Sequence, residues 1–166
     1  MADKKRLVVF HSSSGNTLKV AQALAEALGA DLEQIRPVRP YVVDITGTGA
    51  GNFLNMGRAV LGALLGLAAP IRPPERDPAT YDLVIVGTPV YAGALAGATR
   101  AYLKRQKGKV RDVAFFSCSL DVNQRNLFVK MGKLVGKAPL AFDAFDAAKV
   151  KAGEFAAQVQ SFVAEL

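Results

Sequence analysis

The chain has 166 residues, of which 51% are hydrophobic and 21% charged, and it carries a formal net charge of +7. This is enough to build one domain with its own core, so the composition excludes intrinsic disorder, and the single cysteine, Cys118, excludes an internal disulfide. The charged N-terminus, residues 1–6, lacks the apolar segment of a signal peptide. We therefore expect one cytoplasmic domain over residues 1–166.

The first predicted strand, an apolar run from Leu7 to Phe10, leads directly into a small hydroxyl-rich turn that opens a helix. A helix N-terminus has unpaired backbone N–H groups and a partial positive charge, so it can bind a phosphate. The turn contains no Lys or Arg and has neither glycine pattern of the nucleotide-binding loops. We predict a phosphate held by amides and hydroxyls, as in a mononucleotide cofactor. The assigned residues are Ser12, Ser14, Gly15, Asn16 and Thr17.

A turn of this composition can instead simply cap the helix that follows it. One cap needs one side chain, whereas this turn offers four, which favours the phosphate. Ser13 is expected to point away from the phosphate or into solvent.

The remaining chain alternates helix and strand. An unbroken apolar run from Leu83 to Val86 is typical of a central parallel strand buried on both faces. The apolar stretch from Ala59 to Ala69 is half as long as a membrane helix, which needs about 20 residues, and is interpreted as a buried helix. The pattern predicts an α/β fold with a parallel sheet covered on both sides. Helices are predicted over 17–29, 52–67, 95–107, 123–135 and from about 149, and strands over 31–36, 81–87, 110–118 and 139–145.

Two segments resemble the flavodoxin family. They are Ser12-x-Ser14-Gly15-Asn16-Thr17 after the first strand and Gly87-Thr88-Pro89-Val90-Tyr91-Ala92-Gly93 after the third. With the five-strand rhythm around them, the resemblance extends over nearly the whole chain. It implies a flavodoxin-like, doubly wound parallel sheet of strand order 2-1-3-4-5, with FMN beyond the carboxyl ends of the strands where the strand order reverses.

The resemblance assigns the isoalloxazine ring of FMN to the segment after the third strand. Tyr91 is predicted to stack on the ring, with packing on the next helix as the alternative. The Ala92-Gly93 peptide is predicted to reorient toward the flavin N5. The assigned residues are Thr88, Pro89, Val90, Tyr91, Ala92 and Gly93.

The third loop, from Ser117 to Asp121, departs from the family pattern because positions 117–126 contain no glycine and no aromatic residue. Backbone N–H groups there can still bind the flavin carbonyl oxygens, which makes Cys118, Ser119 and Asp121 candidates. A lone cysteine at the end of a buried strand is more often simply packed. His11, the only histidine, has no identifiable carboxylate partner, so no catalytic residue and no metal site are assigned.

The predicted function is that of an FMN-binding redox protein that transfers electrons between partner proteins. One alternative is an FMN-dependent NAD(P)H:quinone-type oxidoreductase, with the long segment from Val38 to Pro74 walling a pocket over the ring. The other is a non-redox module that has lost the flavin and acts through its basic surface. The sequence shows no dinucleotide fingerprint, which favours the electron carrier.

Part of the positive charge is clustered, with six Lys or Arg residues within positions 100–111 and three more at 130, 133 and 137. The simplest interpretation is two solvated helix faces. If the cluster binds a partner, an acidic redox protein is favoured over nucleic acid, because only Tyr102 lies among the charges to stack on a base. We expect no nucleic-acid partner and no membrane span, and the sequence leaves the oligomeric state open.

Overall fold

The computed structural model describes residues 4–39 and 50–166. The strands are β1 (Arg6–Phe10), β2 (Asp31–Gln34), β3 (Leu83–Tyr91), β4 (Ala94–Leu95), β5 (Asp112–Ser119) and β6 (Phe142–Asp146). The helices are α1 (Asn16–Leu28), α2 (Ala50–Leu64), α3 (Gly97–Arg105), α4 (Arg125–Val135), α5 (Ala147–Ala152) and α6 (Ala156–Ala164), with a short 3-10 helix at Pro78–Thr80.

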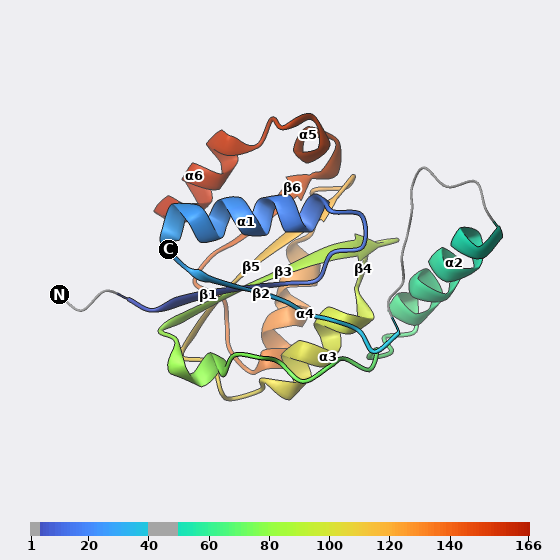
Figure 1. Ribbon diagram of the computed structural model, residues 1–166, viewed down its shortest axis with the longest axis horizontal. Coiled ribbons are helices and arrows are strands. Elements are labelled where there is room, and N and C mark those ends of the chain that lie inside the picture. The colour runs from blue at the N-terminus through green and yellow to red at the C-terminus, as the bar shows by residue number, and fades with distance from the viewer. Residues whose placement is uncertain (1–3, 40–49) are drawn as a thin grey trace.

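The sheet has the order β2-β1-β3-β5-β6, and all four of these pairings are parallel. The short strand β4 pairs antiparallel with the end of β3. Helices α1, α5 and α6 cover one face of the sheet, and α3 and α4 cover the other (Figure 1). Counting the parallel strands in sequence, the predicted α/β fold and the predicted order 2-1-3-4-5 are confirmed.

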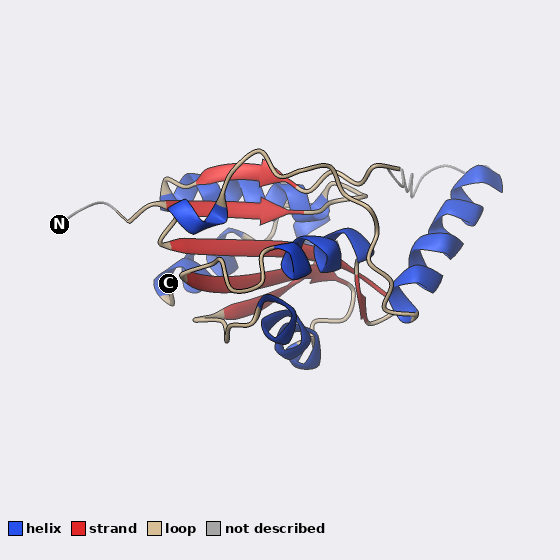
Figure 2. Cartoon of the chain, turned by 90° about the horizontal axis from the view of Figure 1, so that it is seen from below, coloured by secondary structure: helices blue, strands red, loops and turns tan. Residues whose placement is uncertain are grey.

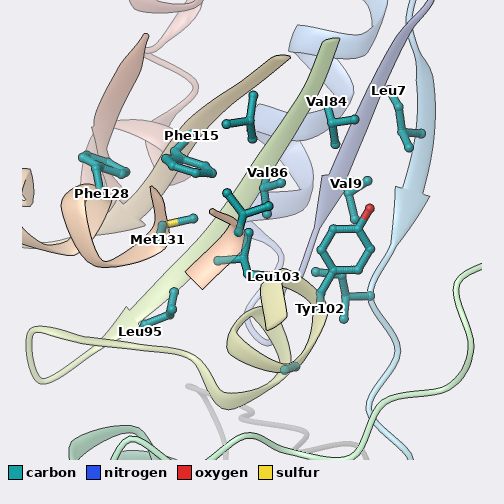
Figure 3. Packing of buried hydrophobic residues seen from close by; sticks show 14 of the residues in the cluster. Leu7, Val9, Val84, Val86, Leu95, Tyr102, Leu103, Phe115, Phe128 and Met131 are labelled. Atoms are coloured by element: carbon teal, nitrogen blue, oxygen red, sulfur yellow. The ribbon is translucent and has the colours of Figure 1, made fainter. Parts of the chain in front are cut away.

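The central strands are apolar on both faces because each face has its own core. In β1, Leu7 and Val9 face α3 and α4, whereas Val8 and Phe10 face α1. Figure 3 shows the first of these clusters, in which Tyr102 and Leu103 of α3 and Phe128 and Met131 of α4 pack on the strands. Burial on both faces is the physical reason that these strands read as unbroken apolar runs.

The third parallel strand is longer than predicted. Residues Thr88 and Pro89, expected in a loop, continue β3 because they pair with Ser117 and Cys118 of β5. Pro89 is tolerated there since β1 ends opposite Gly87 and leaves β3 a free edge. The predicted loop is therefore the end of a strand and a hairpin turn.

The C-terminal helix is also different from its prediction, because it is divided in two. Gly153 has φ 82° and ends α5, and α6 begins three residues later. Asp146 caps α5, where its carboxylate accepts hydrogen bonds from the N–H groups of Ala148 and Lys149 at 2.7 and 3.4 Å. A left-handed glycine is a common helix terminator, and it interrupts the apolar periodicity here.

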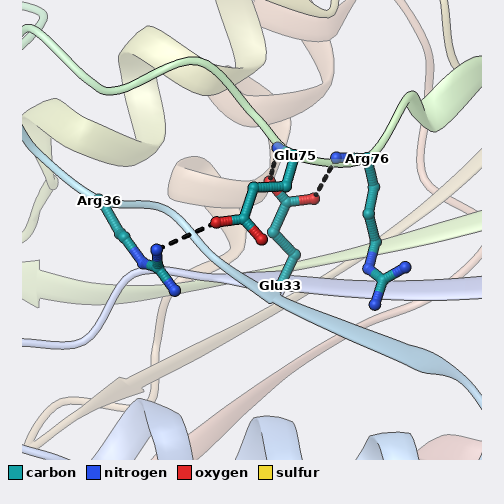
Figure 4. A network of polar contacts seen from close by, with 4 residues as sticks. All are labelled: Glu33, Arg36, Glu75 and Arg76. Carbon is teal, nitrogen blue, oxygen red and sulfur yellow. Dashed lines mark hydrogen bonds and ion pairs between the residues drawn. The ribbon is translucent and has the colours of Figure 1, made fainter.

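An extended segment, residues 70–76, lies beside β2, in place of a packed helix between β2 and β3. Glu33 of β2 is 8% exposed, and its carboxylate accepts hydrogen bonds from the backbone N–H groups of Glu75 and Arg76 at 2.7 and 3.1 Å (Figure 4). Arg36 donates to the Glu75 carboxylate at 3.0 Å. These bonds fix the return path of the chain from α2 to β3.

The prediction of a buried helix in the apolar stretch is wrong. Of α2 and the residues that follow it, Ala59 and Ala63 are buried, but Leu61, Leu64 and Leu65 are 57–64% exposed. The helix stands at one end of the molecule, beyond the sheet (Figure 2). Its leucines therefore do not form part of the core. Across residues 4–39 and 50–166, none of the helices has the length and hydropathy needed to cross a bilayer.

Candidate functional site

The segments after β1, β3 and β5 meet at the carboxyl edge of the sheet because these strands are adjacent and parallel. The N–H of His11 donates to the carbonyl of Gly87 at 3.1 Å, and Pro89 lies in register with Cys118. From β1 the chain passes to β2 on one side, and from β2 it returns to β3 on the other side. The order thus reverses between β1 and β3, which is where open α/β sheets bind ligands.

The hydroxyl-rich turn opens α1 without a side-chain cap. Gly15 is the N-cap with φ 89° and has no side chain with which to cap the helix. Among the described residues, the only hydrogen bond to a side chain that stays within residues 12–17 runs from the Gly15 N–H to Ser12 Oγ, at 3.1 Å. The first turn of α1 also contains no acidic residue. The free N–H groups and partial positive charge of a helix end are suited to an anion, and the assignment of a phosphate to this turn stays a prediction.

The predicted phosphate residues do not all contribute their side chains. Thr17 is 2% exposed, and its hydroxyl lies against the Cys118 thiol beneath the turn. Ser14 is exposed, whereas Ser12 and Asn16 are partly exposed at the mouth of the site. The structure thus presents hydroxyl, amide and backbone donors here, with Thr17 facing inward.

One hydrogen bond joins the phosphate turn to the Tyr91 segment. Ser13 Oγ and the Tyr91 hydroxyl are 2.7 Å apart. Ser13 is partly buried and turned toward Tyr91 rather than into solvent, and the other part of the expectation, that it points away from the phosphate, stays a prediction. Burial raises the pKa of the Tyr91 phenol, while the bond to Ser13 opposes that shift. No local pattern indicates this contact, because the two residues are 78 positions apart.

Tyr91 is the last residue of β3 and stands at the base of a two-residue hairpin turn. It pairs with Ala94, and the turn residues Ala92 and Gly93 have φ values of 49° and 77°. Two successive positive φ values define a type I′ turn, in which a left-handed alanine costs about 1 kcal/mol. Thr88 is fully buried and donates to the Pro89 carbonyl at 2.9 Å, so it offers the site little beyond its backbone.

The loop after β5 is held by its own hydrogen bonds. The Asp121 carboxylate accepts from the Asn123 N–H at 2.9 Å, and the Asp121 carbonyl accepts from the Ser119 hydroxyl and from Gln124 Nε2. Leu120 is 83% exposed at the tip of this loop, a residue that the sequence analysis did not assign. The exposed aliphatic side chain stands where the family pattern would place glycine or an aromatic residue.

Cys118 faces the core rather than the loop. Its side chain is 5% exposed, packs in the cluster on the α1 face, and burial raises the pKa of the thiol to about 12. Only the backbone of Cys118 is therefore placed to contact a ligand. The described residues hold no cluster of His, Cys, Asp and Glu suited to a metal ion.

A cavity of about 310 Å³ lies on the α2 side of Tyr91. It is lined by α2, by the segment that follows it and by the start of α3, and its polar lining includes His11, Arg58 and Tyr91. His11 is 5% exposed, its Nδ1 lies 3.4 Å from the Ile35 carbonyl, and burial lowers its pKa. Of the segment from Val38 to Pro74, which is predicted to wall a pocket over the flavin ring, residues between Arg58 and Pro70 line this cavity; that the ring lies there stays a prediction.

Part of the basic cluster lies at the opposite edge of the sheet. Residues 107–111 immediately precede β5, and Arg111 donates to Asp82, just before β3, at 3.0 Å. The N–H of Gly108 donates to the Val135 carbonyl at 3.1 Å, which brings the end of α4 and its lysines to the same edge. Residues 107–111 and the end of α4 therefore do not border the candidate site, whereas the Arg100 guanidinium on α3 lies beside Gly66, in the segment after α2.

The comparisons with known proteins agree with this geometry. The family model described as flavodoxin matches residues 5–120. The chain therefore belongs to the flavodoxin family. Among the curated proteins, none matches the chain.

Solved structures share the fold. A Lactobacillus acidophilus flavoprotein in complex with FMN is 23% identical, with 90% of this chain and 97% of that chain covered and a TM-score of 0.67. A Bacteroides eggerthii protein assigned as a flavoprotein is 21% identical, with 90% and 95% covered and a TM-score of 0.70. An NADH:FMN oxidoreductase in its apo form is 16% identical, with 96% and 87% covered and a TM-score of 0.51.

Proposed function

We propose that the protein binds FMN at the carboxyl edge of its sheet. The phosphate would lie in the turn from Ser12 to Thr17, and the isoalloxazine ring would lie against the segment from Thr88 to Gly93. Membership of the flavodoxin family supports this proposal, since flavodoxin binds FMN at the point where the strand order reverses between β1 and β3. The similar fold of the FMN-bound Lactobacillus acidophilus flavoprotein also supports it.

The observation that carries the proposal is the combination of an uncapped α1 N-terminus with the bond between Ser13 and Tyr91. The first provides an anion site without any basic side chain, and the second holds an aromatic ring next to that site. A phosphate and a planar ring joined by a short chain fit this pairing. The backbone of Cys118, Ser119 and Asp121 completes the proposed ring site on the β5 side.

When bound, FMN supplies one- and two-electron redox chemistry, while the protein binds and orients it and adjusts its electronic surroundings. We propose that the protein transfers electrons to and from a redox partner protein. That partner would approach the carboxyl edge, where the flavin is proposed to lie, because docking on residues 107–111 at the other edge would not bring a partner to the flavin. The lone thiol of Cys118 fits the cytoplasm as the compartment.

A second candidate function is the reduction of a small acceptor, such as a quinone, by NAD(P)H at the flavin. The cavity beside Tyr91 favours it, since its apolar walls and its few polar groups are typical of a small-molecule site. NADPH consumption that depends on both FMN and a quinone would establish this enzyme activity. Electron exchange only with a protein partner would leave the carrier as the function.

The FMN proposal is tested by titrating the purified protein with FMN and following absorbance at about 450 nm. We expect saturable binding with one FMN per chain, and much weaker binding of riboflavin because it lacks the phosphate. Ser14→Ala should weaken FMN binding about tenfold, the value of one charge-assisted hydrogen bond, and leave riboflavin unaffected. Ser161→Ala, an exposed serine on α6, is the matched control and should change neither.

Equal affinity for FMN and riboflavin would refute the phosphate assignment. Colourless protein that leaves the FMN spectrum unchanged would refute flavin binding altogether. It would favour the non-redox module that acts through its basic surface.

A further inference from the structure

Helix α2 packs the reverse way from an ordinary surface helix. Its buried residues are the small ones, Ala59 and Ala63, at 9% and 2% exposure. Leu54, Leu61 and Leu64 are 66%, 57% and 58% exposed on the opposite side. A surface helix normally turns its large apolar side chains to the core. The leucines of α2 therefore form an apolar face with no described partner within the chain.

The spacing of these leucines is that of a helix that packs on another helix. Leu54 and Leu61 are seven residues apart, and Leu64 follows three residues later, which places them at a, a and d positions of a heptad. Gly57 takes the remaining d position. It is exposed, and a Cβ built there meets no described atom within 4 Å, so a second helix can approach closely. We call Leu54, Gly57, Leu61 and Leu64 the α2 stripe.

The distribution of charge selects the kind of partner. From Ala50 to Leu67 the only charged residue is Arg58, although the whole chain has a net charge of +7. An anionic lipid surface would favour several Lys and Arg residues beside the apolar face. A second copy of this chain is instead best accommodated where its own positive charge is lowest. Helix α2 lies beyond the carboxyl edge (Figure 1), whereas residues 107–111 of the basic cluster precede β5 at the other edge; Arg100, on α3, is the member of the cluster that lies beside Gly66 after α2.

We infer that the α2 stripe is the contact between two copies of this chain, related by a two-fold axis. Such a contact is self-complementary, because the same residues meet their own counterparts. Leu61 also lines the cavity beside Tyr91, as does Leu65. The partner's α2 would therefore cover the mouth of that cavity. This inference does not depend on FMN binding.

Light scattering after size exclusion tests the inference with the full chain. We expect the wild type at twice the chain mass of 17.6 kDa, and the variant Leu61→Glu/Leu64→Glu at 17.6 kDa. The two positions are exposed, so the variant should keep the circular dichroism spectrum and thermal midpoint of a folded protein. Leu140→Glu is the matched control: this leucine is 55% exposed, lies outside α2, and its variant should remain a dimer.

A wild type that stays monomeric up to about 100 μM would overturn the inference, since a specific dimer should form by then. So would a dimer that persists in the double variant. Flotation with vesicles of phosphatidylcholine and phosphatidylserine supplies a further measurement. Vesicle binding by a monomeric wild type, lost in the double variant, would assign the stripe to lipid and contradict the dimer.

Discussion

Gly87 of β3 is the position at which replacing glycine with alanine should lower the free energy of unfolding most. A Cβ added there would lie 2.1 Å from the tip of the Phe116 ring, well inside the closest approach of real atoms. Phe116 is fully buried and meets Phe145 edge-on with ring centroids 6.1 Å apart, so its ring has little room to move. The carbonyl of Gly87 also accepts the His11 N–H, at the entrance to the candidate site.

The size of the effect follows from that contact. Overpacking a dense core costs about 1–3 kcal/mol, and a ring held on both sides places Gly87→Ala at the upper end, about 3 kcal/mol. For a chain of this length, that loss lowers the thermal midpoint by about 6–12 °C. Gly62→Ala is the matched control. Its Cβ meets no described atom within 4 Å on helix α2, so it should gain about 0.5–1 kcal/mol.

Urea unfolding of Gly87→Ala, Phe116→Leu and the double variant checks the cause. Leucine lacks the outer ring atoms, so the double variant should lose at least about 1 kcal/mol less than the sum of the single losses. Strict additivity would refute the proposed clash, because the two sites would then be independent. A loss below about 0.5 kcal/mol in Gly87→Ala would refute the argument that the ring cannot move.

Three further outcomes are expected. Burial lowers the pKa of His11, so the unfolded chain binds a proton at a higher pH than the folded chain does. The free energy of unfolding should therefore fall as the pH drops below about 6.5. In His11→Asn, the difference in urea midpoint between pH 7.5 and pH 5.5 should shrink. The Cys118 pKa of about 12, against 9.0, should make thiol modification by a disulfide reagent about a thousandfold slower in the folded protein than in urea. Glu33→Gln puts an amide donor against two N–H groups and should cost about 2 kcal/mol in the same unfolding assay.

The sequence was sufficient for the sheet and for the position of the turn that opens α1. Strands such as β1 and β5 are apolar on both faces, and their alternation with helices leaves few possible topologies. The turn from Ser12 to Thr17 follows a strand and opens a helix, which is a local pattern that needs no distant contact. That a strand ends and a helix begins there was therefore predictable from adjacent residues, while the phosphate assignment stays a prediction.

Contacts between distant residues decided the rest. Ser13 meets Tyr91, β3 runs on to Tyr91 because β5 and β4 lie beside it, and the Thr17 side chain turns toward Cys118. Helix periodicity could predict α2, but not which side would face the body. The size of the side chains decided which side of α2 faces the body. Ala59 and Ala63 are small enough for α2 to pack against the end of the sheet, and the leucines remain exposed to solvent. Local patterns set which elements form, whereas the exposed face of an element depends on the neighbours that the fold supplies.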